Sequence, residues 1–277
     1  MLPRAISRHR LLLVAVTASA AALPAVAIAA PAAAQSTVHY VALGDSYSSG
    51  VGAGDYYSSS GSCDRSANAY SVLWANANAP ASYTSVACSG ATTSSVIASQ
   101  LSALSSATTL VSITVGGNDV GFSSVMETCV LDSTSACVSA IDTAEGEISA
   151  DLPGELNNVL TAISADAPGA RVVVLDYPDL YDLSQSSGCI GLSTTDRTDL
   201  NQAADQLDSQ IQAAAGRYSD VFADVRSTFA GHEICDSSSW LHSVNFFDID
   251  ESYHPTATGQ ADGYLPVFTA AAKAVGQ

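Results

Sequence analysis

The sequence predicts an α/β fold in which helices wrap one parallel β-sheet. Short apolar and β-branched runs alternate along the chain with longer segments that have helical periodicity, and this alternation is typical of parallel sheets. No internal repeat is visible, and the Ser/Gly-rich stretches are too short to link two domains. We therefore expect a single folded domain.

Five segments have the composition of β-strands. The third and fourth are near-continuous runs of β-branched and apolar residues, which favours strands buried on both faces. In chain order, the expected strands are Val38–Leu43, Tyr83–Ala87, Thr109–Val115, Arg171–Leu175 and Val221–Val225.

Helical periodicity is strongest over Asp196–Tyr218, where Leu200, Leu207 and Ile211 fall on one face with several alanines. The opposite face is charged or carries amides, so we expect it to be exposed to water. Proline marks the expected breaks in two of the other helices. Those helices are Ala69–Asn78, Thr93–Ala103, Ser139–Ala165 with a break near Pro153, and a last helix from Pro255 onward with a break near Pro266.

The first residues have the features of a secretory signal peptide. Three arginines precede an apolar run at residues 11–30, and small residues follow it. Pro24 interrupts the run, which argues against a membrane anchor. Cleavage motifs of the small-x-small kind occur at Ala27-Ile28-Ala29 and Ala32-Ala33-Ala34. We expect residues 1–34 to be removed, leaving residues 35–277 as one secreted domain without stable membrane insertion.

The expected mature domain is strongly acidic. The signal segment contains three of the nine basic residues and none of the 27 acidic ones, so six bases remain against 27 acids and the net charge is −21. A field of this sign repels nucleic acids and anionic membranes, so we expect no nucleic-acid partner. The chain, 47% hydrophobic overall, is long enough for one sizeable core. We expect a monomer.

All six cysteines lie in the expected mature domain, and an even number in an exported protein favours disulfides. Many pairings are possible, and the sequence alone does not choose among them. Joining neighbours in order closes three local loops. No Cys-x-x-Cys pair or Cys/His cluster with zinc spacing supports the alternative of a catalytic or metal-binding cysteine. The pairs in order are Cys63 with Cys88, Cys129 with Cys137, and Cys189 with Cys235.

Three successive strands end in residues suited to acyl transfer: Gly44-Asp45-Ser46, Cys88-Ser89-Gly90 and Gly116-Gly117-Asn118-Asp119. The carboxyl ends of parallel strands share one edge of the sheet, so these groups are expected to converge there. The backbone N–H groups of Ser46 and Gly90 and the amide of Asn118 then form a candidate oxyanion hole.

A histidine follows far downstream in Glu251-Ser252-Tyr253-His254-Pro255, beside carboxylates, and it is the type of base that a serine nucleophile needs. Each motif also has a plain structural alternative. Gly44-Asp45-Ser46 suits a capped strand-to-helix turn, Gly116-Gly117-Asn118-Asp119 a turn, and His254-Pro255 a helix start. Their combination, in this order, favours a secreted serine hydrolase.

These motifs together resemble those of the SGNH (GDSL) hydrolases, over nearly the whole chain after residue 34. Ala42-Leu43-Gly44-Asp45-Ser46-Tyr47-Ser48 resembles the nucleophile block, and the segments with Gly90, Asn118 and His254 resemble the other three. The resemblance implies a flavodoxin-like three-layer α/β/α fold with a five-stranded parallel sheet. It further implies Ser46 as nucleophile, His254 as base, and an oxyanion hole of Ser46, Gly90 and Asn118.

Within this family the chain is most similar to secreted actinobacterial lipases and phospholipases with six cysteines, which implies that the cysteines pair in order. The expected activity is hydrolysis of fatty acyl esters by a lipase or esterase. A phospholipase A1 and a sugar-ester deacetylase are the alternatives among enzymes. A non-catalytic secreted binding domain on the same scaffold is the alternative of another class.

The chain departs from the family pattern at position 251, where Glu251 replaces the aspartate of the Asp-x-x-His block. Either this carboxylate or a main-chain carbonyl of Glu251 or Ser252 is expected to orient His254. Asp248, Asp250 and Glu251 lack the spacing of a calcium loop. The chain also has no Gly-x-Ser-x-Gly elbow, dinucleotide loop or phosphate loop. We therefore expect no cofactor and no metal.

Overall fold

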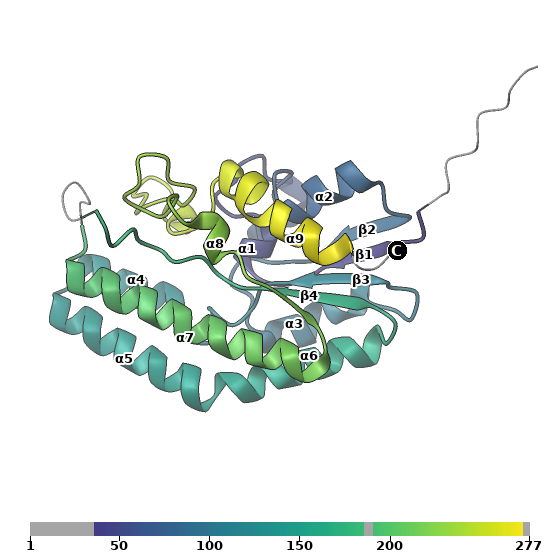
Figure 1. Cartoon of the computed structure of the whole chain (residues 1–277), viewed down its shortest axis with the longest axis horizontal. Helices are drawn as coiled ribbons and strands as arrows, with labels where there is room; N and C mark the ends of the chain where they lie inside the picture. Colours follow the sequence, from purple (N-terminus) through teal and green to yellow (C-terminus); the bar gives the residue numbers. More distant parts are fainter. Residues whose placement is uncertain (1–35, 186–190, 274–277) are drawn as a thin grey trace, which may run out of the picture. The chain divides into compact units, whose positions relative to one another are not determined.

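The computed structural model describes residues 36–185 and 191–273. Five parallel strands form one sheet in the order β2-β1-β3-β4-β5, with helices on both faces (Figure 1). The predicted α/β class, five-stranded parallel sheet and three layers are thereby confirmed. The strands are β1 (His39–Ala42), β2 (Ser82–Ser85), β3 (Leu110–Ile113), β4 (Arg171–Leu175) and β5 (Val221–Ala223).

Two groups of helices cover the sheet (Figure 1). One face carries α1 (Ser46–Ser49), α2 (Tyr70–Asn78), α8 (Arg226–Phe229) and α9 (Leu265–Ala272). The other face carries α3 (Thr93–Ser99), α4 (Phe122–Leu131), α5 (Thr134–Ala150), α6 (Leu152–Asp166) and α7 (Thr194–Tyr218).

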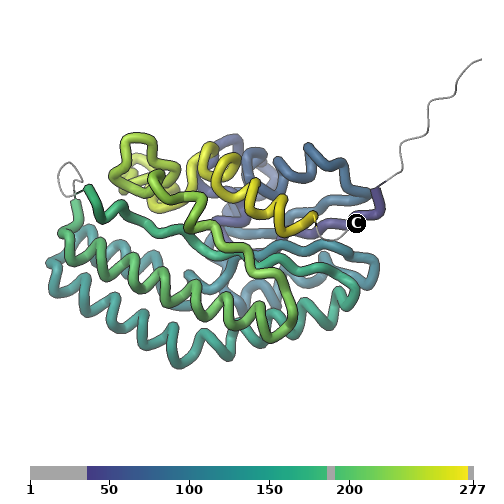
Figure 2. The backbone as a smooth tube through the Cα atoms, viewed as in Figure 1, coloured from purple at the N-terminus to yellow at the C-terminus, as the bar shows by residue number. Residues whose placement is uncertain are grey.

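The core is centred on β3, whose four residues are all buried, and on the buried parts of β1 and β4. Tyr40 of β1 lies opposite Leu110 of β3, and Figure 2 shows these distant parts of the chain side by side. In contrast, β2 is half exposed because it is an edge strand. The prediction that the third and fourth strands lie inside the sheet is confirmed.

Local sequence signals explain most helix boundaries. Capping boxes begin α3 at Thr92 and α7 at Ser193, where each side chain accepts a hydrogen bond from the backbone three residues on. The expected long helix before β4 starts earlier than predicted and divides at Asp151 into α5 and α6, with Pro153 in the first turn of α6.

Two helical segments differ from the prediction. Helix α4 was not anticipated, because it follows Gly121 and has no side-chain cap. The last helix does not start at Pro255, which instead pairs with Leu241 in an isolated antiparallel bridge. A π-helical turn over Gly259–Tyr264 leads directly into α9, so the expected break near Pro266 takes the form of a widened turn rather than an interruption.

Two disulfides join segments that are close in sequence. Cys63 is bonded to Cys88 beside the end of β2, and Cys129 of α4 is bonded to Cys137 of α5. The third expected pair includes Cys189, which lies outside the described residues. No helix within residues 36–185 and 191–273 has the length and hydropathy needed to cross a membrane.

Candidate active site

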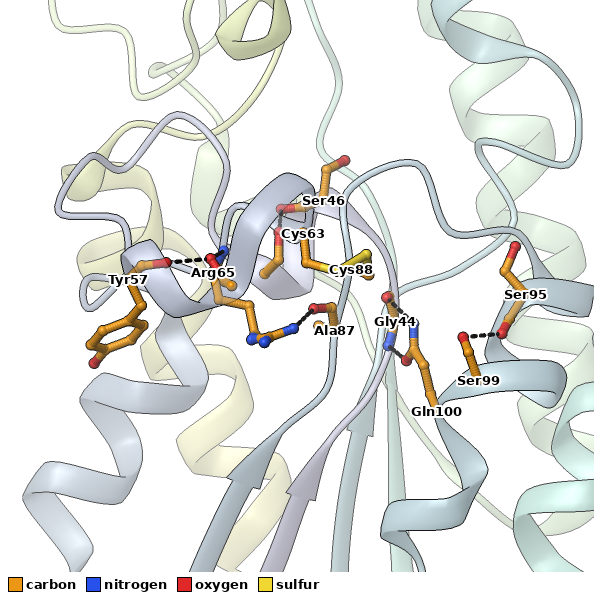
Figure 3. The surroundings of a disulfide bond; sticks show 12 residues. Gly44, Ser46, Tyr57, Cys63, Arg65, Ala87, Cys88, Ser95, Ser99 and Gln100 are labelled. Atoms are coloured by element: carbon orange, nitrogen blue, oxygen red, sulfur yellow. Dashed lines mark hydrogen bonds between the residues drawn. A yellow bond between two sulfur atoms is a disulfide. The ribbon is translucent and has the colours of Figure 1, made fainter.

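A sharp turn carries Ser46 out of β1. Gly44 has a φ of 119°, and a Cβ at this position would collide with the backbone of Thr114, so this turn requires glycine. The side-chain amide of Gln100 holds the turn from the other side: its oxygen accepts from Gly44 N–H and its NH2 group donates to Gly44 O, each at 2.8 Å (Figure 3). The position of Ser46 thus depends on Gln100, the residue that directly follows α3.

Asp45 is the N-cap of the short helix α1, since its carboxylate accepts a hydrogen bond from Tyr47 N–H at 3.0 Å. The plain alternative for this motif is therefore correct for Asp45. The next residue, Ser46, is nearly buried, and its hydroxyl lies 2.7 Å from Nε2 of His254. The nucleophile–base contact that the sequence suggested is thus present, although the two residues are 208 positions apart.

A main-chain carbonyl sets the tautomer of His254. Nδ1 of the ring lies 3.0 Å from Ser252 O, which can only accept, so Nδ1 bears the proton and Nε2 is free to accept from Ser46. The Glu251 carboxylate accepts from the Tyr56 hydroxyl at 2.8 Å instead. Of the two candidate orienting groups, the structure places Ser252 O on the imidazole and Glu251 on Tyr56.

The His254 segment is tied down on both sides. Tyr47 OH donates to Tyr253 O at 2.6 Å, and His242 N–H donates to His254 O at 2.9 Å. Burial, reinforced by the positive potential of His242, lowers the pKa of His254 to about 4, although the hydrogen bond to Ser252 acts in the opposite direction. The imidazole is therefore neutral, and able to act as a base, over most of the accessible pH range.

The candidate oxyanion donors gather beside Ser46. Among the hydrogen bonds of residues 36–185 and 191–273, none has the backbone N–H of Ser46 or Gly90 as its donor. The Asn118 amide donates to Ala91 O at 3.0 Å, which leaves its second N–H for a ligand. The same pocket is lined by all three residues and by His254. The geometry therefore brings together every catalytic and oxyanion residue that the sequence suggested.

At the wall of the pocket, the Asp45 carboxylate is buried and hydrogen-bonded. It accepts from Thr114 Oγ1 at 2.6 Å and from the Tyr177 hydroxyl, which in turn accepts from Gly117 N–H at 3.3 Å. Burial raises the pKa of Asp45 to about 6, while these hydrogen bonds oppose the shift. This network connects the Ser46 turn with the segment that bears Asn118.

The pocket has a volume of about 720 Å³, and it is lined mainly by apolar side chains. None of its lining residues is Lys or Arg. Sequence reasoning missed this lining, although three of its members, four residues apart on α4, had the required helical spacing. The apolar lining comprises Phe122, Met126, Val130, Leu131, Val244, Phe246 and Ile249. Such a surface suits hydrocarbon chains.

Metal ligands are not grouped in the part of the chain that the structure describes: no three His, Cys, Asp or Glu side chains there are placed to hold an ion. A nucleophile, a base and fixed donors are the groups that acyl transfer needs, and Ser46, His254 and the candidate donors are of these types.

Comparisons with known proteins agree with this geometry. Residues 42–261 match the GDSL-like Lipase/Acylhydrolase family. The chain is 54% identical to Lipase 1 of Streptomyces coelicolor over 257 residues, which cover 93% of this chain and 95% of the relative.

Two solved structures are similar to the whole described domain. The phospholipase A1 of Streptomyces albidoflavus NA297 has a TM-score of 0.82 and 52% identity, covering 84% of this chain and 98% of that protein. The extracellular lipase of Streptomyces rimosus has a TM-score of 0.83 and 50% identity, covering 84% of this chain and 99% of that protein. The chain belongs to the GDSL-like lipase/acylhydrolase family.

Proposed function

We propose that this protein is a lipase or esterase that hydrolyses fatty acyl esters through an acyl-enzyme on Ser46. The contact of 2.7 Å between Ser46 Oγ and His254 Nε2 carries this proposal, because it joins a nucleophile to a base whose tautomer is already set. Family membership and relatives named as lipases at about half identity support an ester hydrolase.

In the acylation step, His254 Nε2 takes the proton of Ser46 while Oγ attacks the ester carbonyl carbon. The resulting oxyanion accepts hydrogen bonds from Ser46 N–H, Gly90 N–H and the Asn118 amide. The carbon–oxygen bond to the alcohol then breaks, and His254 returns its proton to the leaving alkoxide. The product alcohol leaves, and the acyl group remains as an ester of Ser46.

Deacylation repeats the steps with water. His254 removes a proton from the attacking water, the same donors hold the second oxyanion, and Ser46 leaves as it recovers the proton from the imidazolium. Throughout the cycle, Ser252 O accepts the hydrogen bond from Nδ1–H and stabilises the charged ring. In this mechanism the enzyme works as a Ser–His dyad. A backbone carbonyl takes the place of the carboxylate that is the third member of a catalytic triad.

The volume and apolar lining of the pocket support fatty acyl chains as substrates, since these walls give little hydrogen bonding to a sugar. A phospholipase A1 activity on the same machinery is the second candidate, because the phospholipase A1 of S. albidoflavus is 52% identical to this chain. We also propose that the protein is secreted. Secretion is supported by the N-terminal signal motif, by the two disulfides and by the extracellular relative from S. rimosus.

Ser46→Ala provides the direct test. We expect hydrolysis of p-nitrophenyl esters to fall by more than about a thousandfold, with the melting temperature little changed, because only the nucleophile is lost. Ser124→Ala, an exposed serine on α4, is the matched control. A phosphonate ester should label the wild-type protein at Ser46 in peptide mass mapping. An active Ser46→Ala variant, or labelling elsewhere, would refute the assignment.

A further inference from the structure

Four large apolar side chains at the mouth of the pocket are exposed to water. Leu131 is 65% exposed, Phe246 75%, Phe247 103% and Ile249 61%, and every other large hydrophobic side chain that the structure describes is less exposed. Three of the four also line the pocket, whereas Phe247 does not. We call these four residues the rim patch. It continues the apolar pocket wall outward onto the surface.

The segment that bears the two phenylalanines is held by its own hydrogen bonds. Asn245 N–H donates to Ser252 Oγ at 2.9 Å, and the Asn245 side chain accepts from Phe247 N–H at 3.1 Å. Ser252 also provides the carbonyl that orients His254. The backbone of the segment that bears the exposed rings is thus tied to the residue that orients His254. Such apolar groups in water indicate a surface that is covered in use.

Charge narrows the choice of what covers the rim patch. Asp248 and Asp250 are exposed in the same segment, and Glu127 is exposed on α4 beside the pocket. No Lys or Arg lines the pocket, and the domain carries a large net negative charge. An anionic lipid surface is therefore repelled. A phosphatidylcholine surface has no net charge, and its outermost groups are cations that can approach these carboxylates.

We propose that the rim patch is a docking surface for a zwitterionic phospholipid surface, into which Phe246, Phe247, Leu131 and Ile249 insert. Docked in this way, the pocket opens toward the acyl region, and a lipid chain reaches Ser46 along apolar walls without crossing water. This inference rests on the proposed ester hydrolase function and names the form in which its substrate is presented.

Binding is measured apart from turnover, in the Ser46→Ala background, by sedimentation with phosphatidylcholine vesicles. Adding Phe247→Ser should weaken the vesicle partition coefficient by about tenfold or more, since one phenyl ring no longer leaves water. Ile97→Ser, which removes an exposed apolar residue on α3, is the matched control and should bind as the parent does. Vesicles of phosphatidylglycerol should bind less than those of phosphatidylcholine.

The second measurement is of activity, in the protein that retains Ser46. Phe247 does not line the pocket, so Phe247→Ser should leave kcat/KM on a monomeric short-chain p-nitrophenyl ester unchanged and lower hydrolysis of vesicle phosphatidylcholine by about tenfold. Unchanged vesicle binding by Phe247→Ser, tighter binding to phosphatidylglycerol, or an effect on self-association alone would overturn the inference. Failure of the proposed function is distinct, since it would abolish monomeric ester hydrolysis while vesicle binding persisted.

Discussion

Two buried aspartates follow strands at the same edge of the sheet, and their surroundings differ. Asp45 follows β1 at the wall of the candidate active-site pocket, and Asp176 follows β4. Both oxygens of Asp45 accept hydrogen bonds from neutral hydroxyl groups, those of Thr114 and Tyr177. For Asp176, Oδ1 accepts from Val225 N–H at 2.8 Å, and Oδ2 has no hydrogen-bond partner among the described residues.

Asp176 belongs to an acidic cluster around one cation. Nε of Arg226 lies 3.6 Å from Asp176 and 3.8 Å from Asp208, while Asp205 and Asp224 hold the same guanidinium from its exposed side. Burial raises the pKa of Asp176 to about 8, against the opposing effects of Val225 N–H and Arg226. Burial and the Asp176 charge raise the pKa of Asp208 as well. In this cluster the folded protein holds protons that the unfolded chain releases.

The comparison shows two ways of keeping a carboxylate out of water. Near Ser46, neutral donors oppose the effect of burial on one carboxylate, so the pKa of Asp45 rises only to about 6. In the acidic cluster, several carboxylates share one arginine, the pKa of Asp176 rises to about 8, and the dependence of stability on pH therefore extends to higher pH. Tyr177 joins the two regions, because its N–H donates to Asp208 and its hydroxyl donates to Asp45.

Among the variants that distinguish the pocket from the acidic cluster, Asn118→Ala in the pocket is expected to have the largest effect. It should lower kcat by about a hundredfold or more with little change in KM, because this donor acts mainly on the developing oxyanion. The free energy of unfolding should change little. Asn158→Ala, at an exposed position on α6, serves as the control. An effect confined to KM would mean that Asn118 binds the substrate in its ground state.

A smaller effect is expected for Glu251→Ala, since this carboxylate touches Tyr56 rather than His254. The loss in kcat should be less than about a hundredfold. Tyr56→Phe removes the same contact and also the acceptor of Gly52 N–H, so its effect should be at least as large, and the double variant should be no worse than Tyr56→Phe alone. A far larger loss for Glu251→Ala with the fold intact would instead make Glu251 the third member of a triad.

The smallest effect is a difference in pH dependence between the regions. The pKa values of Asp176 and Asp208 are raised on folding, so the folded state binds more protons, and these two groups lower the free energy of unfolding as pH rises from about 4 to 8. Asp208→Asn should flatten this slope by up to about 1.4 kcal/mol per pH unit. Urea titrations at a series of pH values measure it.

Activity should follow a different group. His254 must be neutral to act as a base, so its protonation should lower kcat/KM as pH drops toward about 4, in the wild type and in Asp208→Asn alike. The lowered pKa of His254 also reduces the free energy of unfolding in acid, because the unfolded chain binds a proton that the folded chain does not. This contribution is the same in the wild type and in Asp208→Asn, so it cancels when their pH dependences are subtracted. If Asp208→Asn moved the acid limb of kcat/KM, the two regions would be coupled through Tyr177.

Much of this molecule was predictable because its signals are local. Apolar runs marked the five strands, and three strand ends contained Ser46, Gly90 and Asn118, which the parallel topology brings to one edge. Helix α4 was not predicted because no capping side chain marks its first turn. The pocket lining could not be predicted either, since it combines α4 with the segment before His254, and only the folded chain shows that these meet.

The acidic cluster had no signal in the sequence. Asp176 precedes Tyr177 and Pro178, and such a string is typical of an exposed turn. It is buried because Asp208 of α7 and Arg226 of α8 reach it from positions 32 and 50 residues further on. The residues next to a charged group in the sequence do not show whether distant partners bury it or whether it lies in water.

The side chain of Gln100 has a consequence for the shape of the sheet. On the β2 side of β1, Cys88 N–H still donates to Gly44 O, but Gly44 N–H pairs with the Gln100 amide rather than with a strand carbonyl. A carboxamide offers the same donor and acceptor as a peptide group. The inserted side chain therefore ends the ladder of strand hydrogen bonds at Gly44 without leaving a backbone group of that residue unpaired. Beyond this point the two segments no longer depend on each other for their hydrogen bonds, and one continues to Ser46 and the other to Gly90.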